Sequence, residues 1–434
     1  MRSIAFCAAI ALIFLVIFTS AEAGAYPIAL DGPWKFHTGD NLKWADPNFN
    51  DSKWETVDLT PPPGAHDGDV GLSGYVTGWT AKGHPNYSGY AWYRIKVAVS
   101  GYDDRTLMLA APPLVDDAYE VYANGKLVGR DGDFSQDPPM VYSIMPKIFP
   151  MPPLMNDSII ITFRVWVDPA TVAASPGDAG GIHIAPSLSN SIAIHQLYRH
   201  EWKQTFYGYV VDLIEPVLFV IMAMIVFCKK QLRDSIQAKW LIAALILTAL
   251  VRVNQVTFFW FQFESNHDYD IAREVLLTPL CLMAWLFTWR EWFNVRAFTR
   301  WLPPVILLLT AAFMVCRSFS LFWVMPAAHH DLCGKFDSSC NWLRLAFVVL
   351  YLFILFVALR RKQHPKWYLY VLFLLISAGL FAAELSAIHI PGIWFPFGVG
   401  VSRTQYVYAF FILILFFSIN SMASKNNILS RRTA

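Results

Sequence analysis

The half of the chain from residue 207 to 425 consists of long apolar stretches separated by short polar segments. Each stretch is close to the roughly 20 residues that a helix needs to cross the hydrocarbon core of a bilayer. Within lipid, every backbone polar group must be hydrogen-bonded inside the protein, which continuous apolar segments achieve as helices. The sequence predicts seven spanning helices, at residues 208–228, 240–261, 275–293, 302–324, 342–359, 367–389 and 405–423.

Lysine and arginine residues gather after every second apolar stretch, and the alternate loops contain few of them. Positively charged loops stay on the cytoplasmic side of a membrane. The pattern predicts a multi-pass protein of the inner or plasma membrane with an extracytoplasmic N-terminal domain and a cytoplasmic C-terminus. The charged groups are Lys229, Lys230, Arg233 and Lys239; Arg290, Arg296 and Arg300; Arg360, Arg361, Lys362 and Lys366; and Lys425, Arg431 and Arg432.

The first 23 residues have the pattern of a secretory signal peptide. Arg2 precedes an apolar run from Ile4 to Phe18, and Ala21-Glu22-Ala23 is a small-residue cleavage pattern. We expect cleavage after Ala23; the alternative is an anchor helix that is not cleaved. In both cases the region that follows is exported, which agrees with the orientation predicted from the charged loops.

The exported region, residues 24–190, is polar and rich in Gly and Pro. Four of its segments mix β-branched and aromatic residues and are bounded by turn residues, which is typical of strands. These segments are residues 90–99, 105–111, 118–129 and 158–167. Asn124-Gly125 is a strong signal for a two-residue hairpin. Many short strands without helical periodicity predict an all-β domain of the β-sandwich or jelly-roll type.

The composition of the whole chain agrees with a membrane protein. The chain is 56% hydrophobic and 15% charged, whereas soluble domains are about a quarter charged. A formal net charge of +2 without a long basic run argues against a nucleic-acid partner. We predict a connector at residues 191–207, an all-α transmembrane bundle of seven helices at 208–424, and a short basic cytoplasmic tail at 425–434.

Three segments of the exported region resemble the galactose-binding-like jelly roll, the sugar-binding module of glycoside hydrolase family 2 enzymes. They are the stretch from Asp31 to Leu59, the strand YAWYRIKV, and VDDAYEVYANGKLVGRDGDF, and their order matches as well. The resemblance covers roughly residues 30 to 170. It implies a non-catalytic sugar-binding domain, because hydrolase activity in that family lies in a separate barrel that this sequence lacks.

Several polar and aromatic residues of the exported region are candidates for ligand binding. Aromatic rings stack on the faces of sugars, and carboxylates accept hydrogen bonds from hydroxyl groups. Each candidate could instead pack in the core or shape a turn. The candidates are Trp44 and Trp79, in loop-like sequence, and Asp116 and Asp117, which precede a strand. Three further tryptophans are expected in the core, namely Trp34, Trp54 and Trp92.

No catalytic or metal-binding motif stands out. The segment DGDFSQD has oxygen-bearing side chains at alternate positions, but Gln136 and Tyr142 stand where an EF-hand loop needs Gly and Glu. An irregular calcium site and a solvated loop both remain open. The spacing of carboxylates identifies no glycosidase pair, and the membrane half contains no His-Glu-x-x-His motif and no phosphate-binding loop. The sequence therefore predicts no enzymatic activity and no cofactor.

Ionisable residues within the apolar stretches are functional candidates, because a charge in a spanning helix costs roughly 2.5–3.5 kcal/mol on insertion scales. They are Asp212, Glu215, Arg252 and Glu384. The alternative is a structural ion pair between Arg252 and either Glu215 or Glu384. Cys333 and Cys340 lie in a loop predicted to be extracytoplasmic, where a disulfide between them is expected.

An exported β-sandwich followed by seven helices resembles the bacterial seven-transmembrane receptors with diverse intracellular signalling modules. The resemblance implies a receptor that binds an extracytoplasmic ligand, such as a glycan or a cell-wall fragment. After Phe417 too few residues remain for an output domain. The chain is therefore expected to be a truncated sensor or to signal through a cytoplasmic partner protein, and a homodimer remains open. The alternatives are a non-signalling envelope protein with a lectin-like domain and a membrane enzyme acting on lipid-linked sugar.

Overall fold

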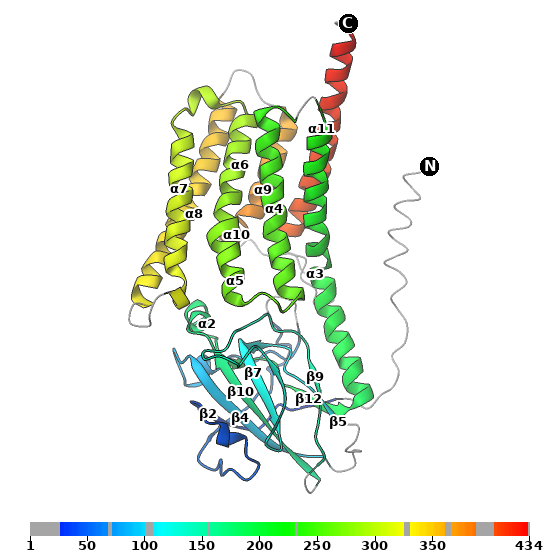
Figure 1. The fold of residues 1–434 in the computed structure, drawn as a ribbon, viewed down its shortest axis with the longest axis vertical. Helices are drawn as coiled ribbons and strands as arrows, with labels where there is room; N and C mark the ends of the chain where they lie inside the picture. Colours follow the sequence, from blue (N-terminus) through cyan, green and yellow to red (C-terminus); the bar gives the residue numbers. More distant parts are fainter. Residues whose placement is uncertain are drawn as a thin grey trace.

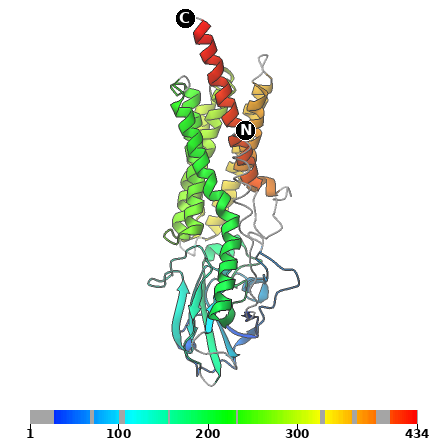
Figure 2. The ribbon, with the colours of Figure 1, turned by 90° about the vertical axis from the view of Figure 1, so that its right-hand side faces the viewer.

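The chain folds into a β-sheet head followed by a helical region, with the head at one end of the helices (Figures 1 and 2). The computed structural model describes residues 27–67, 72–99, 107–154, 157–230, 233–324, 330–360, 366–387 and 403–432. The predicted signal peptide, residues 1–23, lies outside the described residues.

The larger sheet of the head has six antiparallel strands in the order β3-β2-β4-β10-β7-β8. The strands are β2 (Trp34–Thr38), β3 (Glu55–Val57), β4 (Gly89–Ala98), β7 (Ala118–Ala123), β8 (Lys126–Asp131) and β10 (Ser158–Val167). β4 and β10 pair along their whole length, from Ala98↔Ser158 to Gly89↔Val167. Asn124 and Gly125 join β7 to β8 with φ angles of 48° and 83°, which confirms the predicted tight hairpin.

A four-stranded sheet lies opposite, in the order β1-β12-β5-β9. Its strands are β1 (Ile28–Ala29), β5 (Leu107–Ala110), β9 (Ile148–Pro150) and β12 (Ser187–Asn190), and a separate pair is formed by β6 (Val115–Asp116) and β11 (Gly181–Ile182). Trp34 and Phe163 of the larger sheet share one buried core with Leu109 and Leu188 of the smaller sheet. The head is therefore a β-sandwich, held together by apolar side chains between its two sheets.

Helices follow the last strand without a break. They are α3 (Ser191–Cys228), α4 (Ile236–Trp260), α5 (Asn266–Asp270), the π-helical segment η4 (Ile271–Leu277), α6 (Thr278–Trp292), α7 (Leu302–Ser320), the short 3₁₀ turn η6 (Phe322–Val324), α8 (His330–Leu359), α9 (Trp367–Leu380), α10 (Ala382–Ala387) and α11 (Arg403–Arg432). The predicted connector at 191–207 forms the first turns of α3, so no separate linker joins the two parts.

Four helical stretches are long and apolar enough to cross a membrane, among the residues described. They are Ile236–Trp260, Asn266–Trp292, Leu302–Ser320 and Leu332–Leu359, and the shorter apolar helices are Leu213–Cys228, Trp367–Leu380 and Thr404–Asn420. Large apolar side chains also cover the outer surface of these helices: Leu308, Trp342 and Trp367 are 72%, 72% and 73% exposed. Such a surface is stable in lipid and not in water. The helical region is therefore associated with a membrane.

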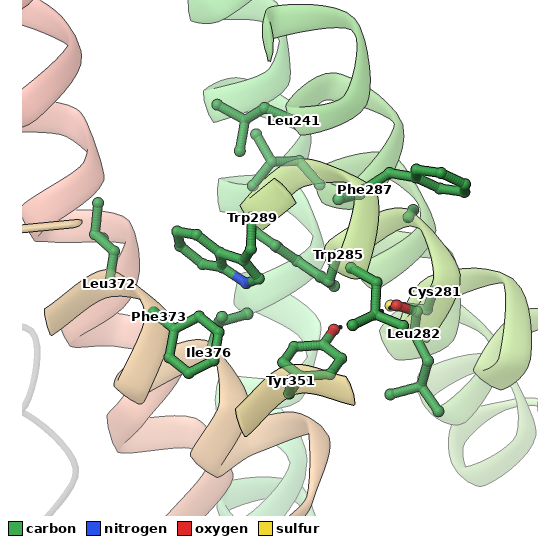
Figure 3. Close-up of a cluster of buried hydrophobic side chains, with 14 of the residues drawn as sticks. Leu241, Cys281, Leu282, Trp285, Phe287, Trp289, Tyr351, Leu372, Phe373 and Ile376 are labelled. Atoms are coloured by element: carbon green, nitrogen blue, oxygen red, sulfur yellow. Dashed lines mark hydrogen bonds between the residues drawn. The ribbon is translucent and has the colours of Figure 1, made fainter. Parts of the chain in front are cut away.

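Aromatic rings from different helices fill the centre of the helical region (Figure 3). Trp285 and Trp289 on α6 stack at 5.7 Å between ring centroids, and Trp289 meets Phe373 of α9 edge-on at 5.3 Å. Tyr351 of α8 lies 5.8 Å from the same Phe373 and donates a hydrogen bond to the Leu282 carbonyl at 3.3 Å. These rings join α6, α8 and α9 by close packing, which holds helices together where lipid supplies no hydrophobic driving force.

The predicted disulfide between Cys333 and Cys340 is wrong. Both residues lie in α8, which begins at His330, and both thiols are free. Seven residues of helix separate their Cα atoms by about 10 Å along the axis, whereas a disulfide requires Cα atoms less than about 7 Å apart. The segment expected to be a loop therefore extends the helix beyond the predicted span, and two cysteines two turns apart in it cannot meet.

Candidate functional site

Loop residues 39–54 fold over the outer face of the six-stranded sheet and bring Trp44 onto it. The ring of Trp44 is half-buried and lies edge-on to Trp54 at 5.2 Å and to Trp92 at 5.9 Å. Trp34, Trp54 and Trp92 are buried, as the sequence predicts for core residues. Trp44 is thus a partly accessible ring of a small aromatic cluster, and it remains a candidate for stacking against a ligand.

Arg94 of the six-stranded sheet fixes the position of this loop by hydrogen bonds. It projects from β4, is 3% exposed, and donates to the Asp51 carboxylate at 2.9 Å. Its other nitrogens donate to the carbonyl oxygens of Trp44, at 3.1 Å, and Pro47, at 2.9 Å. A buried guanidinium that bonds to two loop carbonyls fixes the backbone under Trp44. The position of Trp44 is therefore determined by the sheet rather than by the loop alone.

The prediction for Trp79 is wrong. Trp79 begins the short 3₁₀ helix η2 (Trp79–Lys82), is 2% exposed, and belongs to the core between the two sheets. Its ring lies 6.1 Å from Phe36, and its indole nitrogen donates to the Tyr87 carbonyl at 2.9 Å. A ring that is buried and hydrogen-bonded in this way has no free face for a ligand.

The carboxylates of Asp116 and Asp117 accept hydrogen bonds from backbone N–H groups of the head, and they do not face a common site. Asp116 accepts from Gly180 N at 2.7 Å and lies 3.1 Å from His183 Nε2. The Nδ1 atom of His183 donates to the Val76 carbonyl at 3.0 Å. Burial of the imidazole opposes its charge and lowers its pKa. The hydrogen bond to Asp116 and its charge, the hydrogen bond to the Val76 carbonyl and the charge of Asp178 together outweigh burial and raise the pKa of His183 above its usual 6.5. The Asp116 carboxylate thus favours the charged form of the buried His183.

Asp117 is buried and adopts a φ of +82°. Its carboxylate accepts from Asp168 N at 2.6 Å and from Thr171 Oγ1 at 2.9 Å, at the start of the short helix α2 (Pro169–Ala174). Burial, reinforced by the neighbouring Asp116, raises the pKa of Asp117 to about 8. Asp117 therefore positions the chain at Asp168, and it does not contact a ligand surface itself.

The Asp-rich turn that resembled a calcium loop is used for other contacts. Asp131 is 1% exposed and lies 3.1 Å from Lys147 Nζ, while Asp133 accepts from Ser135 N at 2.9 Å. Asp131 Oδ1 also accepts from Gln262 of the helical region at 2.7 Å. No group of three His, Cys, Asp or Glu side chains is arranged to hold a metal ion in the part of the chain that the structure describes.

Charged side chains surround a cavity of about 590 Å³ in the half of the helical region nearest the head. Arg252 of α4 donates to Glu215 of α3 at 2.8 Å, so the structure brings two of the predicted residues together. Glu384 of α10 instead pairs with Arg344 of α8, at 2.5 Å. Asp212 lies in α3, and its side chain falls outside the described part. Of the four predicted residues, Arg252 and Glu384 line the cavity.

The remaining charges come from segments that were expected to be loops or were overlooked. Arg273 and Glu274 lie in η4, where the extra residue in the helical turn is a feature often found at functional sites. Arg317 of α7 contacts Asp337 of α8 at 2.7 Å and Glu274 at 3.7 Å. Arg317 and Arg344, by contrast with Arg273 and Glu274, lie inside predicted spans, so their charges were signals that the sequence already contained. The cavity thus combines four arginines, each close to a carboxylate.

Polar contacts also join the head to the helices. Gln262, just after α4, donates to Asp131 Oδ1 at 2.7 Å and to the Ser143 carbonyl at 2.8 Å. Asn266 N donates to the Val141 carbonyl at 3.0 Å. His267 Nε2 lies 3.3 Å from Asp168 Oδ2. These contacts connect β8 and the segments after it to the loop between α4 and α5, and they fix the head against the helical region at a second place besides α3.

Comparison with known proteins yields partial similarity to solved structures. No protein-family model matches the chain, and no curated protein matches it. Similar solved structures include a Bacteroides uniformis β-glucuronidase (22% identity, TM-score 0.27, 37% of this chain and 17% of that one). A second is a β-glucuronidase from glycoside hydrolase family 2, with 20% identity and a TM-score of 0.27 over 40% of this chain and 18% of that one. A third is a β-glycosidase from Bacteroides vulgatus, with 20% identity and a TM-score of 0.26 over 38% of this chain and 20% of that one.

The chain spans about a fifth of the length of these enzymes. The assignment of the head as a β-sandwich therefore depends on its own strand pairing and core.

Proposed function

We propose that the chain is a membrane receptor without enzymatic activity of its own. Its head binds an extracytoplasmic ligand of the glycan class, and a bundle of seven spanning helices transmits the change to a cytoplasmic partner protein. The protein lies in the inner or plasma membrane with its head outside and its C-terminus in the cytoplasm. This orientation is supported by the charged loops and by α11, which ends away from the head (Figure 1).

The observation on which the proposal depends is the direct continuation of a sheet strand into a membrane helix. β12 ends at Asn190, whose side chain caps α3 by accepting from Ala193 N at 2.9 Å. α3 then continues for 38 residues, about 57 Å at the usual helical rise (Figure 2). A simple anchor would need no such rigid joint, because a flexible linker holds a domain at a membrane equally well.

The contacts of Gln262 with Asp131 and Ser143 give the head a second attachment, to α4 and α5. Because the head is attached to α3 and also to α4 and α5, a shift of the head moves these helices relative to each other. A ligand produces such a shift only if it binds one arrangement more tightly than the other. Each carboxylate that lines the cavity also lies beside an arginine, which favours a switchable ion-pair network over acid–base catalysis.

Hydrogen exchange on the full chain in lipid nanodiscs tests this proposal, with and without a mixture of soluble bacterial cell-wall glycan fragments that includes acidic sugars. We expect altered protection in the head and also at the end of α3 farthest from it. Gln262→Ala should weaken the distant change, whereas the matched variant Gln237→Ala, at an exposed position of α4, should not. Ligand-induced protection confined to the head would support the anchor alternative and overturn the receptor.

A further inference from the structure

A cleft of about 320 Å³ lies where the head meets the helical region. Its head side includes Trp166, at the end of β10, and Asp168, which precedes α2; its helical side includes His267 of α5 and Phe322 and Trp323 of η6. The volume is within the range of small-molecule sites, about 300–1,000 Å³. The cleft is distinct from the charged cavity and from the surface around Trp44, since it shares no lining residue with either.

The cleft combines flat apolar walls with a few polar groups. Trp166 is 6% exposed and packs against Ala118 and Val141 of the head. On the opposite side, the imidazole of His267 stacks on Trp323, with 4.0 Å between ring centroids and 11° between ring planes. Aromatic walls with a small number of fixed polar groups are the usual composition of a small-molecule site.

Asp168 is held in position before any ligand arrives. Its Oδ1 atom caps α2 by accepting from Ala170 N at 2.7 Å, and its own N–H donates to the buried Asp117. The second carboxylate oxygen, Oδ2, is the atom that lies 3.3 Å from His267 Nε2. That contact is long for a hydrogen bond, whose usual length is about 2.9 Å. Hydroxyl groups of a ligand placed between the two side chains can therefore replace it at little cost.

We propose that this cleft binds a ring of a neutral saccharide, an inference that rests on the proposed receptor function. The apolar face of a pyranose ring packs against the aromatic walls, while its hydroxyl groups donate to Asp168 and bond to His267. A neutral sugar fits better than an acidic one, because a second negative charge next to the Asp168 carboxylate is repelled. The ligand then contacts the head and the helices at once.

A ligand in this cleft can change the position of helical segments beyond the cleft. α5 carries His267 and continues directly into η4, which carries Arg273 and Glu274 to the charged cavity. A saccharide that bonds to both Asp168 and His267 favours the arrangement in which the head and α5 are closest. Binding there biases the position of η4, whereas the rings that Trp44 contacts, His37, Trp54 and Trp92, all belong to the head.

The test is a titration of the full chain in nanodiscs, followed by intrinsic tryptophan fluorescence. The probes are glucose, galactose, mannose, N-acetylglucosamine and the β1,4-linked disaccharides of glucose and N-acetylglucosamine. We expect Trp323→Ala to raise the Kd of the best probe by about tenfold or more. Asp168→Asn, which keeps a capping side chain for α2, should raise it less. Trp342→Ala, at an exposed tryptophan of α8 outside the cleft, should leave the Kd unchanged.

Three results overturn the site. If Trp44→Ala abolishes binding and Trp323→Ala does not, the sugar binds on the outer sheet and the receptor proposal stands. If Trp323→Ala and Trp342→Ala have equal effects, the cleft is not involved. If no probe binds, neutral sugars are not the ligand, while the hydrogen-exchange response to acidic glycan fragments still decides on the receptor separately. Isothermal calorimetry on each variant shows that a lost fluorescence signal is lost binding.

Discussion

The ion pair between Glu215 and Arg252 offers the most quantitative test of the helical region. The two side chains are 3% and 9% exposed, and Arg252 Nε lies 2.8 Å from Glu215 Oε2. Arg252 also donates to Gln255 Oε1 at 2.8 Å. Because α3 and α4 each supply one partner, the pair joins the helix that continues from the head to its neighbour in the helical region.

Replacing Glu215 by leucine leaves a buried guanidinium without its carboxylate. Removing one partner of a buried ion pair destabilises a protein by about 3–5 kcal/mol. We expect the lower end, about 3 kcal/mol, because Arg252 keeps its bond to Gln255 and borders the cavity. That corresponds to about a hundredfold change in the folding equilibrium. The double variant Glu215→Leu with Arg252→Leu removes both charges and should lie within about 1 kcal/mol of the wild type.

Reversible unfolding in mixed micelles with increasing SDS, followed by tryptophan fluorescence, measures these free energies. Asp234→Leu is the matched control, since Asp234 is 82% exposed and lies 3.5 Å from Arg233; an exposed pair contributes less than about 1 kcal/mol. The reasoning is refuted if Glu215→Leu destabilises no more than Asp234→Leu. It is also refuted if the double variant is as unstable as the single one, since the loss would then come from packing and not from the uncompensated charge.

Three further predictions concern a glycine, a carboxyl group and a pair of cysteines. Gly379→Ala, whose new methyl group would collide with the Tyr408 ring, should lower stability in the same SDS assay by about 1–3 kcal/mol, whereas Gly334→Ala, with open space around it, should not lower it. The stability of the wild type should fall as pH rises between the usual pKa of Asp117, 3.8, and its folded value of about 8, because ionisation of this carboxyl then favours the unfolded chain. Thermal unfolding at pH 5 and pH 8 measures the fall, and Asp117→Asn should reduce it. An equal fall in the variant and the wild type would contradict a buried carboxyl with a raised pKa. Alkylation of the denatured, unreduced protein should label both cysteines of α8, and a mass showing two protected thiols would restore the disulfide.

Much of the fold followed from local sequence patterns. The strand segments at 90–99 and 158–167 appear as β4 and β10, and Asn124-Gly125 forms the hairpin between β7 and β8. The apolar stretches appear as helices, four of them long enough to cross a membrane among the residues described. These features depend on neighbours in the chain: β-branched alternation, turn residues with positive φ, and the length of an apolar run.

The candidate site was predicted less well, because it depends on contacts between distant residues. Trp44 and Trp79 both lie in loop-like sequence, yet the sheet places one at the surface and the other in the core. The loop expected around Cys333 is helical, since a polar segment at the end of an apolar run can extend the helix as well as end it. Asp168 and His267 are 99 residues apart, and nothing in either local sequence indicates that they meet.

The sequence by itself determined that a β domain precedes helices apolar enough to lie in a membrane, since strand patterns and the length of apolar runs are properties of short segments. The tertiary structure alone decided that α3 continues from β12 without a linker, that arginines of four helical segments surround one cavity, and that a cleft forms between head and helices. Burial and pairing of charged groups result from packing between segments far apart in the chain, and local sequence patterns do not specify which of many possible packings is the most stable.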